Sequence, residues 1–214
     1  MIILVLLMGT ASIFCITLYS CKKYRIPLWK AIPFSLIAPV MGVLGTKLMA
    51  YIENGSFGGQ SFFGAVLFTP VFMCMLAPLF RIKLSDFLDL CAPGECGMLI
   101  MQKISCLVNG CCKGRIFSYN AAGEAIRFPS QLVECITAVI LLCVFLCLIQ
   151  DGKQRGKLYP WYLVLYGSTR FVLNLFRETT PFIWILPAGN FWSIIAVAIG
   201  AAVLFYLKKQ ECKL

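Results

Sequence analysis

The chain has 214 residues, of which 60% are hydrophobic and only 13% are charged, and its formal net charge is +10. Charged residues make up about a quarter of an ordinary soluble protein, so this composition excludes a soluble globular domain and predicts an integral membrane protein. The basic residues are dispersed among apolar runs and form no stripe on a polar face, which argues against a nucleic-acid partner.

Seven largely apolar segments predict an all-α fold, a polytopic transmembrane helical bundle with about seven membrane segments. Each is close to the roughly 20 residues that a helix needs to cross a lipid bilayer. No long polar stretch remains between them, so residues 1–214 are expected to form a single integral membrane domain. In chain order the segments are Met1–Ser20, Ala31–Ile52, Ser61–Phe80, Asp86–Val108, Ser130–Ile149, Leu158–Phe176 and Asn190–Leu207.

The first segments carry simple topological signals. The cations of the first segment, beginning at Lys22, follow it rather than precede it, which is the reverse of a signal peptide and predicts a retained helix with its N-terminus outside. In the second segment, Gly42 and Gly45 permit close contact with a neighbouring helix. The glycine-rich stretch Glu53–Gln60 is then expected to be an outer loop.

The fourth segment is interrupted by Pro93 and Gly94, with Glu95 beside them. Irregular backbone at membrane depth survives only against protein or a wet cavity, so a broken or re-entrant helix is expected here. Further outer loops are expected at Asn109–Phe128 and Arg177–Pro187, and the C-terminus is expected in the cytoplasm.

The basic residues follow the positive-inside rule, because 12 of the 19 lie in the four stretches predicted to be cytoplasmic, which hold four, two, three and three of them. The other seven lie in or near the outer half of the membrane, where topology does not require them. They are Lys47, Lys103, Lys113, Arg115, Arg127, Arg170 and Arg177. Cations there indicate an anionic ligand, and the nearest anion is a phospholipid head group.

An arginine near a helix centre costs about 2.5 to 3.5 kcal/mol on insertion scales, so Arg170 needs a partner or a watery cavity. Four side chains share one face of its helix because of their spacing: Tyr166, Arg170, Asn174 and Arg177. A phosphate suits the guanidinium forks. The alternative is an ion pair inside the membrane with Glu134 or Glu178.

Two motifs flank the predicted loop 109–128. Residues 103–115 break at Asn109-Gly110 into a glycine-punctuated turn with two cations, which cannot continue a helix. Residues 127–134 begin a helix with Pro129 or Ser130 at the cap, and capping accounts for both of them. The glutamine and the final glutamate of this motif lie one turn apart on one helix face.

The twelve cysteines do not indicate a disulfide framework, because several fall inside apolar runs, where thiols act as small hydrophobes. No C-x-x-C pair and no histidine are present, so the usual zinc spacings have nothing to build on, and neither a metal nor another cofactor is expected. The adjacent Cys111 and Cys112 permit two interpretations. Nearby cations lower a thiol pKa and favour redox chemistry, and the alternative is a purely structural turn.

Together these motifs resemble the prolipoprotein diacylglyceryl transferase family, in the branch with a Gly-Cys-Cys turn. Residues 103–115 resemble its signature, residues 127–134 its His-Pro-Ser-Gln-Leu-Tyr-Glu box, and residues 166–178 its Tyr-Gly-x-x-Arg-Phe helix. The likeness extends over most of the chain from about Met41 onward.

The resemblance implies an enzyme that crosses the bacterial cytoplasmic (inner) membrane several times. Such enzymes transfer the diacylglyceryl group of phosphatidylglycerol to the lipobox cysteine thiol in a prolipoprotein signal peptide, and they release glycerol phosphate. The resemblance places the phosphate near Arg170 and Lys103, which are expected to be catalytic. Glu134 is the candidate proton acceptor in a chain without the family histidine. The residues expected to bind substrate are Asn109, Gly114, Arg115, Arg127, Gln131, Tyr166, Asn174 and Arg177.

Four positions depart from the family pattern. The histidine of the family's glycine loop is Phe63 here, its signature arginine is Lys103, the acid after Asn-Gly is Cys111, and the glutamate after the helix arginine is Asn174. The missing histidine removes the obvious general base, whose help is typically worth about 10² to 10⁴ in rate. A thiol, with a pKa of about 8.5, needs that help less than an alcohol does.

Three functions therefore follow from the sequence. The main prediction is the diacylglyceryl transferase, since the ordered motifs and the outer cations both support it. The alternatives are a non-catalytic phospholipid-binding protein derived from that family, which Phe63 and Asn174 favour, and a membrane thiol oxidoreductase that uses Cys111 and Cys112.

Overall fold

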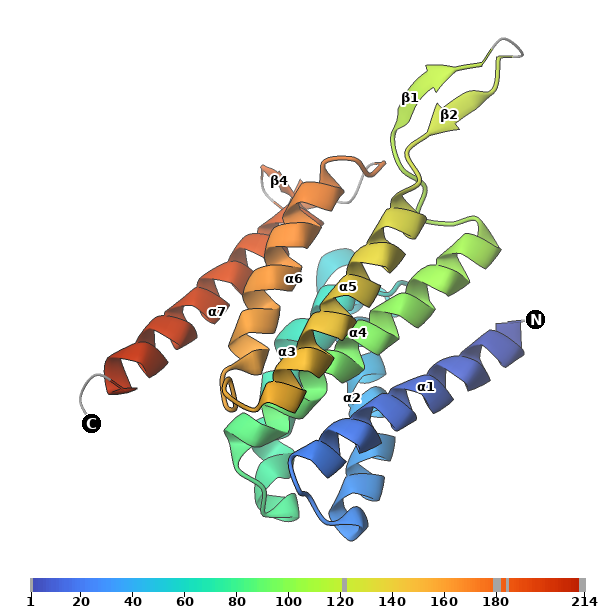
Figure 1. Cartoon of the computed structure of the whole chain (residues 1–214). Coiled ribbons are helices and arrows are strands. Elements are labelled where there is room, and N and C mark those ends of the chain that lie inside the picture. Colours follow the sequence, from blue (N-terminus) through green and yellow to red (C-terminus); the bar gives the residue numbers. More distant parts are fainter. Residues whose placement is uncertain (1, 121–122, 179–181, 184, 212–214) are drawn as a thin grey trace.

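The computed structural model describes residues 2–120, 123–178, 182–183 and 185–211. Within them the chain forms seven helices that run up and down in one bundle (Figure 1), as the sequence predicted. Part of the predicted loop Arg177–Pro187, residues 179–181 and 184, lies outside the described residues. The helices are α1 (Ile2–Lys23), α2 (Leu28–Asn54), α3 (Phe62–Phe80), α4 (Leu84–Asn109), α5 (Ser130–Asp151), α6 (Leu158–Asn174) and α7 (Ala188–Glu211).

Four of the described helices, α2, α3, α5 and α7, are long and apolar enough to cross a membrane. Helix α6 has only 17 residues, and α4 carries buried charged side chains along its length. Asp86 and Asp89 lie near the start of α4, Glu95 in its middle and Lys103 near its end. Because α4 packs against α1, α3, α5 and α6, these charges meet protein rather than lipid.

The prediction of a broken helix at Pro93 is wrong. Helix α4 continues through Pro93 and Gly94, and both are buried. A proline removes one helical hydrogen bond, but a neighbouring helix supports the backbone here, since a Cβ on Gly94 would lie 3.3 Å from Thr17 Oγ1 of α1. Glu95 instead accepts a hydrogen bond of 3.1 Å from the hydroxyl of Tyr159 on α6.

A second acidic side chain, Asp89, anchors the start of α6 at the end of the bundle where α4 begins. Asp89 is fully buried and accepts hydrogen bonds from the backbone nitrogens of Leu158 and Tyr159, at 2.9 and 3.2 Å, and from the hydroxyl of Tyr24 at 3.0 Å. It therefore satisfies the unpaired N–H groups at the start of α6. Through this contact α4 sets the position of the helix that carries Arg170.

Glycines bring α2 and α3 together, as predicted for Gly45. A Cβ on Gly45 would lie 2.5 Å from the backbone oxygen of Gly64, and one on Gly64 would lie 2.0 Å from the backbone oxygen of Gly45. Backbone therefore meets backbone, and any side chain here would force the helices apart. Gly42, one turn earlier, faces the flexible Met98 side chain instead.

We expect Gly45→Ala to lower the free energy of unfolding by about 1 to 3 kcal/mol, because the added methyl group meets backbone that cannot move without separating the helices. Thermal unfolding of the detergent-solubilised protein measures the loss. Gly42→Ala is the matched control, since its Cβ lies 3.0 Å from Met98 Sδ, which can rotate away. Equal losses in the two variants would contradict the close packing of α2 on α3.

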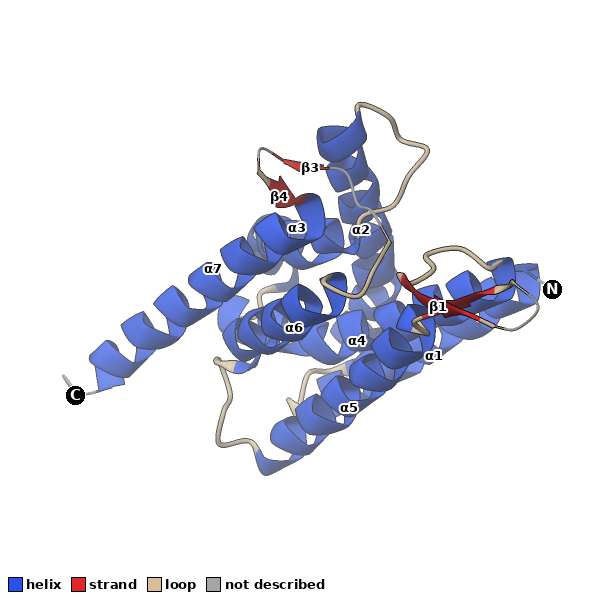
Figure 2. Cartoon of the chain, turned by 90° about the horizontal axis from the view of Figure 1, so that it is seen from above, coloured by secondary structure: helices blue, strands red, loops and turns tan. Residues whose placement is uncertain are grey.

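The predicted outer loop 109–128 contains a β-hairpin, which the sequence did not indicate. Strand β1 (Ile116–Tyr119) pairs antiparallel with β2 (Ala125–Arg127), and the two strands project beyond the bundle from the ends of α4 and α5 (Figure 1). A smaller hairpin, β3 (Phe182–Ile183) with β4 (Leu186–Pro187), precedes α7. Figure 2 shows that the two hairpins stand apart at this end of the molecule.

Candidate active site

A cavity of about 490 Å³ lies at the hairpin end of the bundle, between α4, α6, the start of α7 and the loop that joins α2 to α3. Its walls include both charged and aromatic side chains. They include Lys103, Arg170, Arg177, Tyr166, Asn174 and Phe63. Four of these side chains were predicted to share one face of α6 and its C-terminal extension, and all four reach the cavity, as their spacing requires: Tyr166, Arg170, Asn174 and Arg177.

Glu134, one turn into α5, organises the cations of this cavity. Its Oε2 atom lies 2.6 Å from Lys103 Nζ and accepts a hydrogen bond from Nη1 of Arg170, and its Oε1 atom lies 3.7 Å from Nη1 of Arg177. The exposed fractions of the Glu134 and Lys103 side chains are only 3% and 5%. The ion pair between Arg170 and Glu134, which the sequence left open as an alternative, is thus present.

One carboxylate cannot neutralise three cations. Lys103, Arg170 and Arg177 together carry three positive charges against the single negative charge of Glu134, an excess of two within these four side chains; the Glu53 carboxylate and the Cys112 thiol line the same cavity. The side chains of the two arginines are only 12% and 14% exposed, which limits screening by water. An excess of positive charge within these four side chains favours binding of an anion, and the cavity beside them has room for one.

Several polar atoms of the cavity walls lack a protein partner. Among the described residues, Nε of Arg170, Nε of Arg177 and the hydroxyl of Tyr166 are buried without a hydrogen bond. All three atoms can donate a hydrogen bond, and unpartnered buried donors are costly. An anion with several oxygens, such as a phosphate diester, supplies the acceptors that they lack.

The remaining outer cations mostly hold loops in place. Arg115 Nε donates to the backbone oxygen of Arg177 at 3.0 Å, and Arg127 Nη1 contacts Glu178 at 2.5 Å. Lys47 Nζ donates to two backbone oxygens of the glycine loop, at 3.0 and 3.2 Å. Arg115 and Arg127, both predicted to bind substrate, therefore lie beside the cavity and fix its rim.

The start of α5 holds the turn that follows α4. Ser130 Oγ donates to the backbone oxygen of Cys112 at 2.8 Å, and Gln131 Nε2 donates to that of Cys111 at 2.5 Å. The prediction that capping accounts for Ser130 is therefore wrong. Pro129 is the N-cap residue, the first turn of α5 has no side-chain cap, and the Ser130 hydroxyl is used to position the turn.

Gly114 allows the chain to pass close to this site. A Cβ there would lie 2.3 Å from the backbone oxygen of Phe128, and Gly114 itself forms an isolated β-bridge with Arg177. Asn174 donates to Oδ1 of Asn190 at 2.8 Å, which ties the end of α6 to the start of α7. Both residues predicted to bind substrate thus shape the cavity through backbone and helix contacts.

Phe63 occupies the position where the family pattern has a histidine. Its ring is buried in the cavity wall, 5.5 Å from the ring of Tyr166 between centroids. It can pack against a ligand but cannot accept a proton. The carboxylates of Glu53 and Glu178 also line the cavity, and they already bind Ser61 and Arg127.

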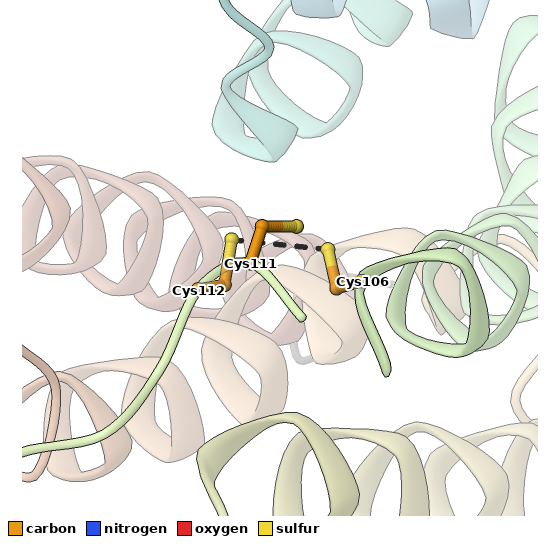
Figure 3. A group of neighbouring side chains, drawn as sticks. All are labelled: Cys106, Cys111 and Cys112. Atoms are coloured by element: carbon orange, nitrogen blue, oxygen red, sulfur yellow. Dashed lines mark hydrogen bonds between the residues drawn. The ribbon is translucent and has the colours of Figure 1, made fainter. Parts of the chain in front are cut away.

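Three cysteines meet beside the cationic cavity. Cys106 lies in the last turns of α4, and Cys111 and Cys112 follow the end of that helix (Figure 3). The Cys106 thiol donates a hydrogen bond of 3.8 Å to the sulfur of Cys112. This hydrogen bond and the positive charges of Lys103 and Arg177 lower the pKa of the Cys112 thiol from 9.0 to about 5.

A second cavity, of about 520 Å³, adjoins the first and is mainly apolar. Its walls come from α1, α2 and α4, and they include Asn109, the remaining residue predicted to bind substrate. The two cavities share four wall residues: Gln60, Gln102, Cys106 and Cys112. A polar, cationic space and an apolar space therefore meet at one wall, as a phospholipid with a charged head and apolar chains requires.

A family model described as prolipoprotein diacylglyceryl transferase matches residues 3–206. The chain belongs to this family. As a diacylglyceryl transferase by family, it is a membrane enzyme of lipoprotein biosynthesis, and the resemblance inferred from its motifs is confirmed.

Curated relatives agree with this assignment at low sequence identity. The transferase is similar to the phosphatidylglycerol–prolipoprotein diacylglyceryl transferase of Dehalococcoides mccartyi, with 21% identity over 202 residues that cover 83% of this chain and 76% of the relative. The enzyme of that name from Lactococcus lactis is 24% identical over 222 residues, covering 90% and 85%. The one from Teredinibacter turnerae is 29% identical over 164 residues, covering 70% and 56%.

Two features of the transferase's site were missed by sequence reasoning. Cys106 was overlooked because it lies five residues before Cys111, outside the spacings expected of a metal site. Gln102, next to Lys103, was also overlooked, although it lines both cavities. A search for cysteines one helical turn before a helix end would have found the first of them.

Proposed function

We propose that the chain transfers the diacylglyceryl group of phosphatidylglycerol to the lipobox cysteine thiol of a prolipoprotein, with release of glycerol phosphate. The observation that carries this proposal is the excess of two positive charges around Glu134, with unpartnered arginine donors, in a cavity that adjoins an apolar one. The names of the curated relatives supply the two substrates.

In this reaction the acceptor thiol gives its proton to solvent, and its thiolate sulfur attacks the glycerol carbon that carries the phosphate. A carbon–sulfur bond forms, the carbon–oxygen bond breaks, and its electron pair stays on the phosphate oxygen. Arg170, Arg177 and Lys103 are placed to bind the phosphate and to stabilise the charge that develops on this leaving group. The acyl chains and the apolar part of the acceptor peptide fit the second cavity.

Glu134 is assigned a positioning role in this mechanism. A carboxylate surrounded by three cations holds its negative charge firmly and is a poor proton acceptor. It keeps the two arginines and Lys103 at one end of the cavity, where a phosphate can bridge them. The sequence-based role of Glu134 as the base is therefore replaced by an electrostatic one in this proposal.

The topology follows from the same assignment. We infer seven crossings of the bacterial cytoplasmic membrane, with the N-terminus outside and the C-terminus in the cytoplasm. The bundle places the start of α1 and the end of α7 at opposite ends (Figure 1), as an odd number of crossings requires. The cationic cavity and the hairpins then lie at the external face.

Purified protein in nanodiscs, incubated with phosphatidylglycerol and a lipobox peptide, tests the proposal. Mass spectrometry is expected to detect the thioether-linked diacylglyceryl peptide, and an enzymatic assay the glycerol phosphate released. A peptide with serine in place of the cysteine is the control. Absence of product with both peptides, together with retained binding of phosphatidylglycerol, would support the second candidate, a non-catalytic lipid-binding protein, which the burial of Phe63 in the cavity wall favours.

A further inference from the structure

The thiols of Cys106, Cys111 and Cys112 converge on one point. Their three sulfur atoms all lie within 4.8 Å of one another, and the sulfurs of Cys106 and Cys112 are 3.8 Å apart. Figure 3 shows the three side chains directed toward one another from the end of α4 and the turn after it. Thiols that act only as small hydrophobes lie in an apolar core. These three thiols lie instead at the walls of the two cavities.

This spacing suits a zinc ion. Zinc–thiolate bonds are about 2.3 Å long, and tetrahedral geometry then places the sulfurs about 3.8 Å apart. The Cys106–Cys112 separation already has this value, and the farthest pair is within 4.8 Å. Three thiolates leave the fourth tetrahedral position open, which is the arrangement of catalytic rather than structural zinc sites.

The backbone holds the cluster in this arrangement without a metal. The backbone nitrogen of Cys111 donates to the backbone oxygen of Cys106 at 3.1 Å, and Cys112 adopts the left-handed conformation with φ of 58°. Ser130 and Gln131 bind the two backbone oxygens of the turn from the neighbouring helix. The three thiols are thus placed by contacts that do not involve their sulfur atoms.

Charge around the cluster is also favourable. Three thiolates and one Zn²⁺ carry a net charge of −1, and Lys103, Lys113 and Arg177 line the same cavity as Cys106 and Cys112. The cluster stands in the wall shared by the cationic and the apolar cavities. A fourth ligand would therefore lie next to both the phosphate and the lipid chains.

We propose that Cys106, Cys111 and Cys112 bind a zinc ion whose fourth ligand is the thiol of the acceptor peptide. This inference rests on the proposed transferase function and names the group that prepares its nucleophile. A thiol that coordinates zinc loses its proton to solvent and becomes a thiolate. The thiolate sulfur then attacks the glycerol carbon, the carbon–oxygen bond breaks, and glycerol phosphate leaves with the electron pair.

The zinc supplies what the side chains of the cavity lack. The chain contains no histidine, Phe63 cannot accept a proton, and three cations hold the charge of Glu134. The other two carboxylates of the cavity, Glu53 and Glu178, bind Ser61 and Arg127. A general base contributes about 10² to 10⁴ in rate, and activation of the thiol by a metal replaces that contribution. The cysteine cluster thus provides a replacement for the histidine that the family pattern has at Phe63.

Metal content provides the first test, and it does not depend on activity. The full-length protein is purified in detergent with a thiol reductant and without chelator. Inductively coupled plasma mass spectrometry is expected to find one zinc per chain. Cys106→Ser and Cys111→Ser are each expected to contain at least tenfold less. Cys143→Ser, an exposed cysteine on α5 outside the cluster, is the matched control and keeps its zinc.

Cobalt substitution tests the fourth ligand. The Co²⁺-loaded protein is expected to show thiolate-to-cobalt charge-transfer absorption, which increases when the lipobox peptide binds and does not increase with the serine peptide. In the transfer assay, Cys111→Ser is expected to be about 10²-fold slower than Cys143→Ser. Retained helical content by circular dichroism shows that a slow variant is folded.

The outcomes separate this inference from the proposed function. Transfer by a zinc-free wild-type protein, at a rate that the serine substitutions leave unchanged, overturns the zinc site and leaves the transferase standing. A Cys106–Cys112 disulfide in place of metal also overturns it, in favour of a redox pair. Zinc and a cysteine-specific cobalt signal without any transfer support the metal site and contradict the transferase.

Discussion

Arg170→Ala is expected to lower the rate of diacylglyceryl transfer by about 10² to 10³, which is the usual cost of removing one preorganised donor from a developing negative charge. Arg170 binds Glu134 through Nη1 and keeps Nε without a protein partner, so its guanidinium can bridge the carboxylate and a phosphate. The fold is expected to survive, because Glu134 retains Lys103 and Arg177 as partners.

Arg170→Lys separates charge from geometry. It keeps the positive charge but loses the planar fork, so an intermediate rate is expected, closer to that of the alanine variant. Lys209→Ala, at the exposed end of α7, removes one cation far from the cavity and is expected to leave the rate unchanged. If Arg170→Ala transferred as fast as the wild type while staying folded, the cavity would not be the phosphate site.

Glu134→Gln is expected to destabilise the protein more than any single loss of a cation, by about 3 to 5 kcal/mol. This substitution leaves three buried cations without a negative partner, whereas loss of one cation leaves Glu134 with two. Thermal unfolding in detergent, compared with Arg170→Ala, measures the difference. Transfer is also expected to fall, because mutual repulsion disperses the cations that bind the phosphate.

A second substitution distinguishes charge balance from local packing. Combining Glu134→Gln with Lys103→Met removes one of the unpartnered cations and is expected to recover part of the lost stability without recovering transfer. Additive losses in the double variant would contradict the electrostatic explanation. Bound phosphatidylglycerol is expected to stabilise Glu134→Gln more than the wild type, since the lipid phosphate supplies the missing negative charge.

The positions of the helices were predicted well, because each helix is an apolar run of about 20 residues and charged residues separate the runs. Predicted and observed starts of the last three helices differ by at most two residues, and α5 begins at Ser130 in both. The cationic face of α6 was also predicted, since a helix fixes which residues share a face. Both successes depend on periodicity and composition alone.

The failures concern contacts between segments that are distant in the sequence. The sequence showed that Arg115 and Arg127 are unusual cations, but only the fold shows that they bind Arg177 and Glu178 at the rim. Pro93 was predicted to break its helix. This prediction was wrong because the sequence does not show that α1 packs against α4 and supports the backbone there. The β1–β2 hairpin was missed because its strands are short and, except for Arg127, exposed, without an apolar alternation.

Those rim contacts make the β1–β2 hairpin and the cation cluster a single mechanical unit. The backbone of Arg115 donates to Phe176 and its side chain to Arg177, while Gly114 bridges to Arg177 itself. A displacement of the hairpin therefore shifts Arg177, which lies 3.7 Å from the carboxylate of Glu134 on α5. A protein that binds this projecting hairpin would thus shift Arg177 relative to Glu134 and change the charge distribution of the cavity.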